Sequence, residues 1–376
     1  MKIILHSPSS VSEITDIYKQ AFSEAVRLYV VSAYLTEWDI SLQLNDGCKK
    51  FRVIVGKDFG ITKKSACLDL MKWLSAERKS QFMVADAIDG FHPKAIFWMD
   101  KSDNCFSLIG SSNLTKAAFH KNYEANIFSE ISKDEFIKSE EWIKEIEDQS
   151  VVVSEDWLGE YQEAKPAPNK NSKHKYKGAN VITLKLPNPS GSKRQVAKRR
   201  VQLTAHDNLK DSLKNLFLKC RDGNISSSEF YDLLPSVWSW DSGNRLQGSG
   251  WERQGKGSNF KEISTSFINI LNAKPMDRDD IVVKEIDKLK AIKSSARRAF
   301  FSEILCLTFP DKYPVLNKPV KDYIKDIGFR APKGASEGAR YLDLAKKLRT
   351  SLAQNPKHPA NNLAELDTVI WLAYGE

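Results

Sequence analysis

Three short segments in the first part of the sequence carry polar side chains at a spacing suited to chemistry. His92 and Lys94 stand in the first, Ser111 and Asn113 in the second, and Glu124 in the third. Because residues i and i+2 share a face of a β-strand, neighbouring strands can gather these side chains on one surface. An imidazole can attack phosphorus and form a phosphohistidine, Lys, Ser and Asn donors can hold phosphate oxygens, and a carboxylate can fix the histidine tautomer. The set predicts phosphodiester chemistry that uses no metal and no cofactor.

These residues resemble the signature of the phospholipase D superfamily, which stands here as His92-x-Lys94, Ser111-x-Asn113 after a glycine, and Glu124. The resemblance covers about residues 1–163, the size of one half-unit of that family. It implies that His92 is the nucleophile, that Lys94, Ser111 and Asn113 bind phosphate, and that Glu124 orients His92. Each residue also has a purely structural interpretation. His92 could be a structural histidine, Ser111 and Asn113 could form a turn before a helix, and Glu124 could be a surface carboxylate.

One position departs from the family pattern. The family usually carries an aspartate five residues after the lysine, where this chain has Met99, and Asp100 follows it. Since that aspartate is structural in the family, the shift concerns the geometry of the hairpin more than the catalytic residues.

A second histidine is implied by the same resemblance. Phospholipase D enzymes place two such histidines on opposite sides of the phosphate, one attacking while the other protonates the leaving oxygen. Of the six histidines in this sequence, only His92 heads an H-x-K triplet. We therefore expect a two-fold homodimer, formed through the N-terminal domain, in which the second subunit contributes its own copy of this residue.

Strands and helices alternate in residues 1–163, which indicates an α/β domain with a mixed sheet flanked by helices. The strands after residue 80 follow one another too closely for helical crossovers, so part of the sheet should be antiparallel. The expected strands are Ile3–Leu5, Leu28–Tyr34, Phe51–Val55, Gln81–Ala85, Phe91–Trp98, Cys105–Ile109 and Asn122–Phe128, and the expected helices are Ser10–Ala25, Ile61–Ser75, Ser132–Ile146 and Ser154–Ala164.

The rest of the chain divides into a linker and a mainly α-helical domain. Residues 164–200 are rich in Pro, Asn and Lys and predict a basic linker with one short strand at Val181–Leu186, and residues 201–376 predict the second domain. The helices expected there are His206–Cys220, Ser226–Leu234, Phe260–Leu271, Asp279–Ala291, Ser294–Leu307, Lys318–Ile327, Ala335–Leu352 and Leu363–Tyr374.

The net charge of +9 over 376 residues is concentrated in one stretch. Ala164–Arg200 contains eleven Lys and Arg and no Asp or Glu, which leaves 46 cations and 48 anions elsewhere. A basic stretch favours a polyanionic partner, although a solvated linker would have the same composition. The basic stretch therefore favours nucleic acid over lipid as the expected substrate.

A catalytic segment, a basic link and a second domain resemble metal-independent restriction endonucleases with an N-terminal phospholipase D-like domain. The resemblance implies a DNA endonuclease of restriction or phage defence, with defence proteins as further partners. The Gly- and Trp-rich stretch Trp238–Gly257 holds residue types that stack on bases and read groove edges, or is a loop whose Trp residues are anchored in the core. The candidate DNA contacts are Lys193, Arg194, Lys198, Arg199, Arg200, Trp240, Arg245, Trp251 and Arg253. The alternatives are a phospholipid phosphodiesterase or phosphatidyltransferase and an inactive nucleic-acid-binding protein on the same scaffold.

Other protein classes fit the sequence poorly. No apolar run approaches the roughly 18 residues of a membrane span, and the polar start predicts no signal peptide. The five cysteines are scattered without a C-x-x-C pair, which indicates reduced thiols and excludes a zinc ribbon. We expect a cytoplasmic protein that does not bind membranes.

Overall fold

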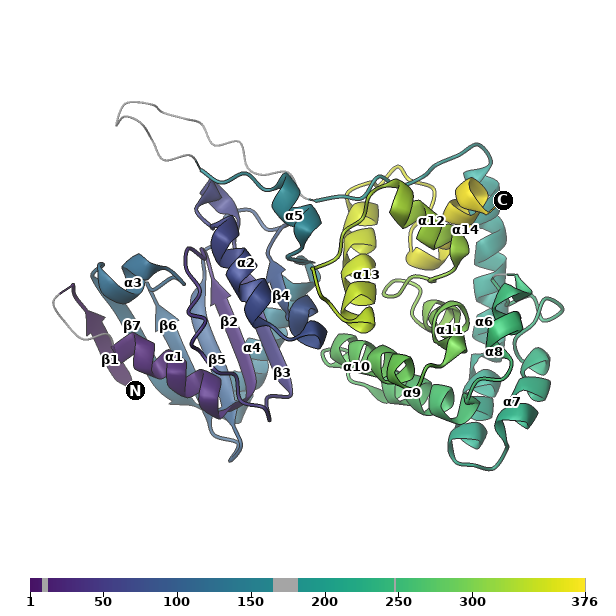
Figure 1. Cartoon of the computed structure of the whole chain (residues 1–376), viewed down its shortest axis with the longest axis horizontal. Coiled ribbons are helices and arrows are strands. Elements are labelled where there is room, and N and C mark those ends of the chain that lie inside the picture. The colour runs from purple at the N-terminus through teal and green to yellow at the C-terminus, as the bar shows by residue number, and fades with distance from the viewer. Residues whose placement is uncertain (9–12, 165–181, 247, 376) are drawn as a thin grey trace. The chain divides into compact units, whose positions relative to one another are not determined.

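The computed structural model describes residues 1–8, 13–164, 182–246 and 248–375. The chain forms two compact units, which are described separately below. The N-terminal unit comprises Met1–Ile182 with Arg330–Ala335, and the C-terminal unit comprises Thr183–Phe329 with Ser336–Glu376. Figure 1 shows the sheet of the first and the helices of the second.

The N-terminal unit is built on one eight-stranded sheet with the order β1-β7-β6-β5-β2-β3-β4-β8. Its strands are β1 Lys2–His6, β2 Ala25–Ser32, β3 Lys50–Val55, β4 Phe82–Val84, β5 Lys94–Asp100, β6 Cys105–Gly110, β7 Glu124–Ile131 and β8 Val151–Val152. The β2, β3 and β4 strands run parallel, and every other neighbouring pair is antiparallel. The predicted mixed sheet is confirmed.

Helices cover the two faces of this sheet unequally. The first face carries α1 (Glu13–Glu24) and α2 (Lys64–Trp73), which share one large apolar core with the strands (Figure 1). The second face carries α4 (Lys133–Asp148), whose Phe136, Ile143 and Ile146 pack against β2 to β5. The short helices α3 (Lys116–His120) and α5 (Glu155–Glu160) complete the unit.

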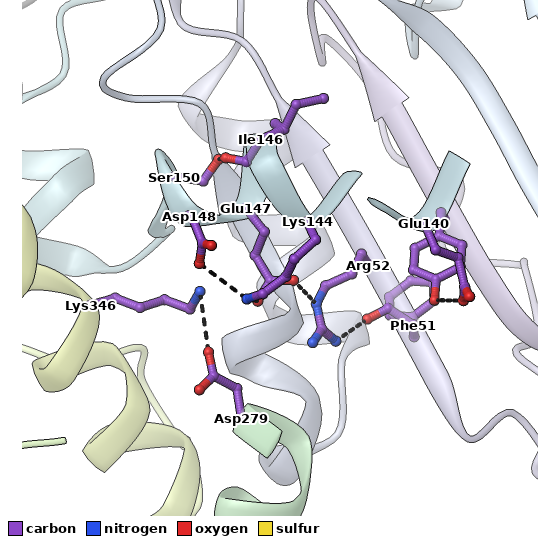
Figure 2. A network of polar contacts seen from close by, with 11 residues as sticks. Phe51, Arg52, Glu140, Lys144, Ile146, Glu147, Asp148, Ser150, Asp279 and Lys346 are labelled. Carbon is purple, nitrogen blue, oxygen red and sulfur yellow. Dashed lines mark hydrogen bonds and ion pairs between the residues drawn. The ribbon is translucent and has the colours of Figure 1, made fainter. Parts of the chain in front are cut away.

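Buried ion pairs hold α4 on the sheet. Arg52 of β3 places its Nε 3.1 Å from Glu147 of α4, and its Nη1 donates to the carbonyl of Phe51 at 2.7 Å (Figure 2). The Tyr29 hydroxyl donates to Glu140, one of whose oxygens also lies 2.7 Å from Arg27. Removing one partner of a buried pair costs about 3–5 kcal/mol, so these contacts fix the position of the helix.

The C-terminal unit is mainly α-helical, as predicted. Its helices are α6 Ser192–Arg221, α7 Ser227–Leu233, α8 Glu252–Gly255, α9 Phe260–Asn272, α10 Arg278–Ala291, α11 Ala299–Thr308, α12 Lys318–Asp326, α13 Glu337–Ala353 and α14 Leu363–Tyr374. The long α6 packs against α9 and α14. A second core gathers Leu344 and Leu348 of α13 with Leu366 and Ile370 of α14.

Two predictions for the segment between the units need correction. The strand expected at Val181–Leu186 is wrong over its described residues, 182–186, which form no strand. Their alternation of apolar and polar side chains has another cause: Ile182 is buried in the core of the N-terminal unit and Leu184 in that of the C-terminal unit. The Leu184 N–H donates to the Ser351 hydroxyl at 2.7 Å. The expected linker at 164–200 is helical from Ser192 onward, after Gly191 in the left-handed region (φ 89°). Its residues 165–181 lie outside the described residues.

Candidate active site

The five predicted site residues lie at one end of the sheet. In the strand register, Ser32 at the end of β2 faces Lys94 at the start of β5, and Gly110 at the end of β6 faces Asn126 near the start of β7. Antiparallel pairing therefore brings the beginning of β5, the end of β6 and the beginning of β7 together. This topology unites residues that are 30 positions apart in the chain.

His92 and Lys94 stand side by side in the lead-in to β5. Lys94 Nζ lies 3.0 Å from His92 Nδ1, 3.3 Å from His92 Nε2 and 3.0 Å from the His92 carbonyl oxygen. The ring of Tyr34 meets the imidazole edge to face at 5.9 Å between centroids. A neutral imidazole accepts a hydrogen bond from an ammonium and is also the form that can attack phosphorus.

The strand predicted from Phe91 begins only at Lys94. Gly90 takes a positive φ of 71°, and the Phe91 N–H donates to Asp58 at 3.0 Å, so the chain turns before the strand starts. Phe91 is buried and anchors this turn, while His92 is exposed. The histidine therefore belongs to an anchored loop, which leaves its ring accessible to a substrate.

Ser111 and Glu124 are joined directly across β6 and β7. The Ser111 hydroxyl donates to Glu124 and accepts from the Ala125 N–H at 3.0 Å, while Asn122 Nδ2 donates to the other Glu124 oxygen at 3.0 Å. Glu124 is only 8% exposed. Glu124 thus accepts hydrogen bonds from Ser111 and Asn122, and its predicted role of orienting His92 stays a prediction.

Asn113 is fixed by contacts with the end of β2. Its Oδ1 accepts hydrogen bonds from the Tyr34 N–H at 3.2 Å and from the Ser32 hydroxyl at 3.4 Å. Ser32 in turn accepts from the Leu114 N–H at 3.0 Å. Because the carbonyl oxygen is committed to these donors, the amide nitrogen of Asn113 is the group that can bind a phosphate oxygen.

Gly110 is required by the close approach of β7. A Cβ on this residue would lie 2.3 Å from the Ala125 carbonyl oxygen and 2.6 Å from the Asn126 Cα. Only glycine lets β6 pass this backbone and turn into the loop that carries Ser111 and Asn113.

Burial and charge act in opposite directions on Lys94. Burial lowers the pKa of its ammonium, and the negative charge of Glu124 raises it in part. Glu124 therefore helps to keep the lysine in its cationic form. Among the residues that the structure describes, no three His, Cys, Asp or Glu side chains gather in a way that could hold a metal ion.

The predicted DNA contacts of α6 separate into two groups. Lys193, Arg194 and Lys198 are exposed on the first turns of the helix. Arg199 is 3% exposed and lies 3.1 Å from Asp367, and Arg200 makes a two-pronged contact with Glu365 at 2.7 and 3.1 Å. Arg199 is therefore enclosed in the protein in this structure and presents no surface to DNA.

The predicted contacts in the Gly- and Trp-rich stretch divide in the same way. Arg245 lies 2.6 Å from Glu252 and over the Trp238 ring, while Trp251 packs against Phe300 at 4.7 Å between centroids. Arg245 and Trp251 therefore contribute to the packing of the C-terminal unit. Trp240, 53% exposed, and Arg253 remain on the surface.

Some residues of the site had no individual signal in the sequence. Ser32, Tyr34 and Asn122 orient the predicted residues, yet the first two are about 80 positions from the asparagine they contact. Their role depends on the pairing of β2 with β5, which spacing along the chain does not reveal. Asp100, the displaced aspartate, accepts from the N–H groups of Ser102 and Asn104 and closes the hairpin between β5 and β6.

Comparison with known proteins bears on the N-terminal unit. Residues 18–147 match the family described as cardiolipin synthase, PLD-like domain. The chain contains a phospholipase D-like domain. The match spans every strand from β2 to β7 and includes all five predicted site residues.

Other comparisons add little to this domain assignment. Among solved structures the chain is similar to NucT from Helicobacter pylori, with 16% identity, 40% of this chain and 99% of that chain covered, and a TM-score of 0.30. No curated protein matches the chain. None of the helices in the described residues is long and apolar enough to cross a membrane.

Proposed function

We propose that this protein is a metal-independent endonuclease that hydrolyses DNA through a phosphohistidine intermediate. The observation that carries the proposal is the exposed His92 imidazole with Lys94 Nζ 3.0 Å from its ring, beside the amide of Asn113 and the linked pair Ser111–Glu124. This set supplies a nucleophile, a cation and neutral donors at one place. The phospholipase D-like domain supports phosphodiester cleavage as the reaction class.

In the first step, a ring nitrogen of His92 attacks phosphorus. The new P–N bond forms as the P–O bond to the leaving nucleoside oxygen breaks, and that oxygen takes a proton from the partner subunit's His92. Lys94 and the Asn113 amide hold the non-bridging oxygens, whose charge must be stabilised in the transition state.

In the second step, water attacks the phosphohistidine. The partner subunit's His92 accepts a proton from the water as the new P–O bond forms and the P–N bond breaks. Both histidines then return to their starting protonation states. Two histidines are needed because one must attack while the other protonates the leaving group.

The sheet offers a surface where a second copy can bind. The α4 helix covers β6 and β7 at Cys105 and Ile131 and leaves the other end of these strands uncovered. There Ile109, Ile127 and Ile3 lie in register across β6, β7 and β1. Their exposed fractions are 48%, 47% and 64%. We call this row, with the 74% exposed Leu5, the apolar strip. The strip adjoins Ala125, whose backbone bonds Ser111, while Lys94 and Glu124 belong to the opposite face of the sheet. A symmetric partner on the strip therefore has to reach the site past the ends of β6 and β7.

DNA is the substrate favoured by the charges of the C-terminal unit. Lys193, Arg194 and Lys198 form an exposed cationic row at the start of α6, and Trp240 and Arg253 are exposed in the same unit. Such cations bind phosphates in a salt-dependent way, and an exposed Trp can stack on a base. We infer a role in restriction or phage defence in the cytoplasm, with defence proteins as partners.

A lipid activity is the second candidate. The family that matches residues 18–147 carries the name of cardiolipin synthase, an enzyme of phospholipids. The same histidine chemistry can cleave a phospholipid headgroup. The concentration of cations on α6 favours DNA over this alternative. The third candidate is an inactive binding protein on the same scaffold.

One experiment separates these candidates. The purified chain is incubated in EDTA with supercoiled plasmid, RNA and phospholipid vesicles in parallel. We expect nicking of the plasmid, and loss of nicking by at least about 10³-fold in His92→Ala, because the nucleophile is removed. Binding of plasmid by the variant serves as the test of its folding.

The outcomes assign the function directly. Cleavage that needs added metal, or nicking by His92→Ala, contradicts the mechanism. Turnover of phospholipid alone transfers the proposal to lipids, and binding without cleavage of any substrate supports the inactive scaffold.

A further inference from the structure

A cavity of the N-terminal unit lies next to the loop that carries Ser111 and Asn113. It encloses about 380 Å³ and is lined by α1, by the segment after β2 and by the residues from Leu114 to His120. Ligand pockets for small molecules begin at about 300 Å³, so the cavity is large enough for one aromatic heterocycle. The catalytic mechanism above does not use it.

The cavity lies next to the loop that carries Asn113. Leu114 and Thr115 line it and directly follow Asn113, and two residues of chain span at most about 7 Å. The Thr36 N–H donates to the Leu114 carbonyl at 2.9 Å, which joins the segment after β2 to the same loop. A base in the cavity would therefore belong to a nucleotide next to the phosphate that Asn113 would hold.

Rigid aromatic rings form the apolar part of the lining. Trp38 is 5% exposed and is held by edge contacts with Phe22 and Trp73, at 5.9 and 5.1 Å between centroids. Tyr18 meets Phe119 edge to face at 5.2 Å. Phe119 is half-buried, and its contact with the buried Tyr18 holds it in a position where a planar ligand can stack on it.

The polar part of the lining selects the ligand further. The carboxylates of Glu37 and Asp39 lie at the cavity, and Lys116 Nζ is 3.8 Å from Glu37. Asp39 is held by Ser41, whose N–H and hydroxyl donate to it at 2.9 and 2.6 Å. Carboxylates accept hydrogen bonds from the exocyclic amino groups of bases.

We propose that this cavity binds one unpaired nucleobase of the substrate strand, on a nucleotide adjacent to the scissile phosphate. The proposal rests on the proposed nuclease function. A base must leave its pair to enter a cavity of this size, so the strand at the site is single-stranded or locally opened. The cavity would place the phosphate relative to His92 through the base.

The test is a double-mutant cycle of binding. The inactive His92→Ala chain is titrated with a single-stranded oligonucleotide, and then with versions in which one position at a time is abasic. We expect one abasic position to weaken binding by about 5- to 150-fold, the range for loss of one stacked base. In the background Phe119→Leu, which keeps apolar volume but removes the ring, that penalty should fall several-fold.

A second variant, at an exposed residue, tests the cavity without disturbing the packing of the core. Glu37→Gln changes an exposed side chain and is expected to weaken binding of an amino-bearing base at that position more than binding of thymine. Lys121→Ala, exposed at the end of the same loop, is the matched control and should leave the abasic profile unchanged. The proposal is overturned if no abasic position matters, or if the penalty is the same with and without the Phe119 ring.

A second measurement separates this proposal from the nuclease proposal. Hydrolysis of a fully abasic oligonucleotide, which has phosphodiesters but no bases, by the wild-type chain tests His92 chemistry without the cavity. If the abasic penalty depends on the Phe119 ring but no diester is hydrolysed, the cavity assignment stands and the nuclease proposal is rejected. Diester hydrolysis without base coupling rejects the cavity assignment only.

Discussion

At the scale of single residues, Lys94 connects the electrostatics of the site to its chemistry. Burial lowers the pKa of its ammonium and the charge of Glu124 opposes that change. The same Glu124 carboxylate bonds Ser111 and Asn122. One buried carboxylate therefore both holds two neighbours and sustains the charge of a third.

The first prediction concerns pH. Only the cationic form of Lys94 binds phosphate, so activity should fall on the alkaline side as the lysine loses its proton. Replacing Glu124 by Gln removes the charge that raises the lysine pKa, and the alkaline limb of kcat/KM should move to lower pH. Lys94→Arg, which remains charged, should lose this limb altogether.

The controls for this prediction lie on the same sheet. Lys94→Ala should lower kcat/KM by about 10²–10³-fold, as expected for a lost transition-state donor. Lys101→Ala, exposed in the turn at the far end of β5, should leave both rate and pH profile unchanged. An alkaline limb that persists in Lys94→Arg would assign it to another group.

How much of the site could be predicted depends on the range of the contacts. The pairs His92–Lys94 and Ser111–Asn113 show in the spacing because each lies within one short segment. The hydrogen bonds that Asn113 receives from Tyr34 and Ser32 come from a strand about 80 residues earlier. Such contacts follow from sheet order, and the interleaved order β6-β5-β2-β3 cannot be obtained from local pattern.

At the scale of elements, α6 shows how one helix divides a run of charges. Lys193, Arg194 and Lys198 point outward in its first turns, while Arg199 is buried against Asp367. The richness of this segment in Pro, Asn and Lys predicted a linker, in which all cations would be equivalent. Once the chain is helical, side chains one position apart point in different directions and neighbouring cations take different roles.

The second prediction follows from this division. Arg199→Ala leaves the buried Asp367 without its cation and should destabilise the C-terminal unit by about 3–5 kcal/mol. Arg194→Ala, five residues earlier and exposed, should leave the melting temperature unchanged and reduce both DNA affinity and its dependence on salt. Thermal unfolding and DNA titrations at several salt concentrations measure the two effects.

Either result can contradict the assignment. An Arg199→Ala chain that melts like wild type would show that the ion pair with Asp367 contributes little. A triple variant of Lys193, Arg194 and Lys198 to Ala with an unchanged salt slope would remove α6 from the DNA contacts.

At the scale of the whole molecule, the uneven cover of the sheet is the feature that bears on assembly. The α4 helix protects β2 to β5, and the apolar strip on β6, β7 and β1 is left to solvent in the single chain. Exposed apolar residues in register on adjacent strands mark a contact surface. The predicted elements of the sheet contained these strands, but their exposure follows from where α4 packs.

The third prediction tests the strip as a dimer contact. Ile127→Asp places a charge in its middle row and should convert a dimer into a monomer that has lost nearly all nuclease activity. Ile137→Asp on α4 is a matched control, because Ile137 is 48% exposed against 47% for Ile127. Sedimentation measures the mass of each, and an active Ile127→Asp monomer would refute the shared site.

The apolar strip also has a consequence for dosage. If each active site is assembled from two chains seated on that strip, an inactive chain that still dimerises disables every wild-type chain it binds. Activity in a mixture should then follow the square of the wild-type fraction, so that equal amounts of wild type and His92→Ala retain about a quarter of the activity after subunits exchange. A cell that makes such a chain alongside the normal one would lose more of the activity than the loss of one copy would remove.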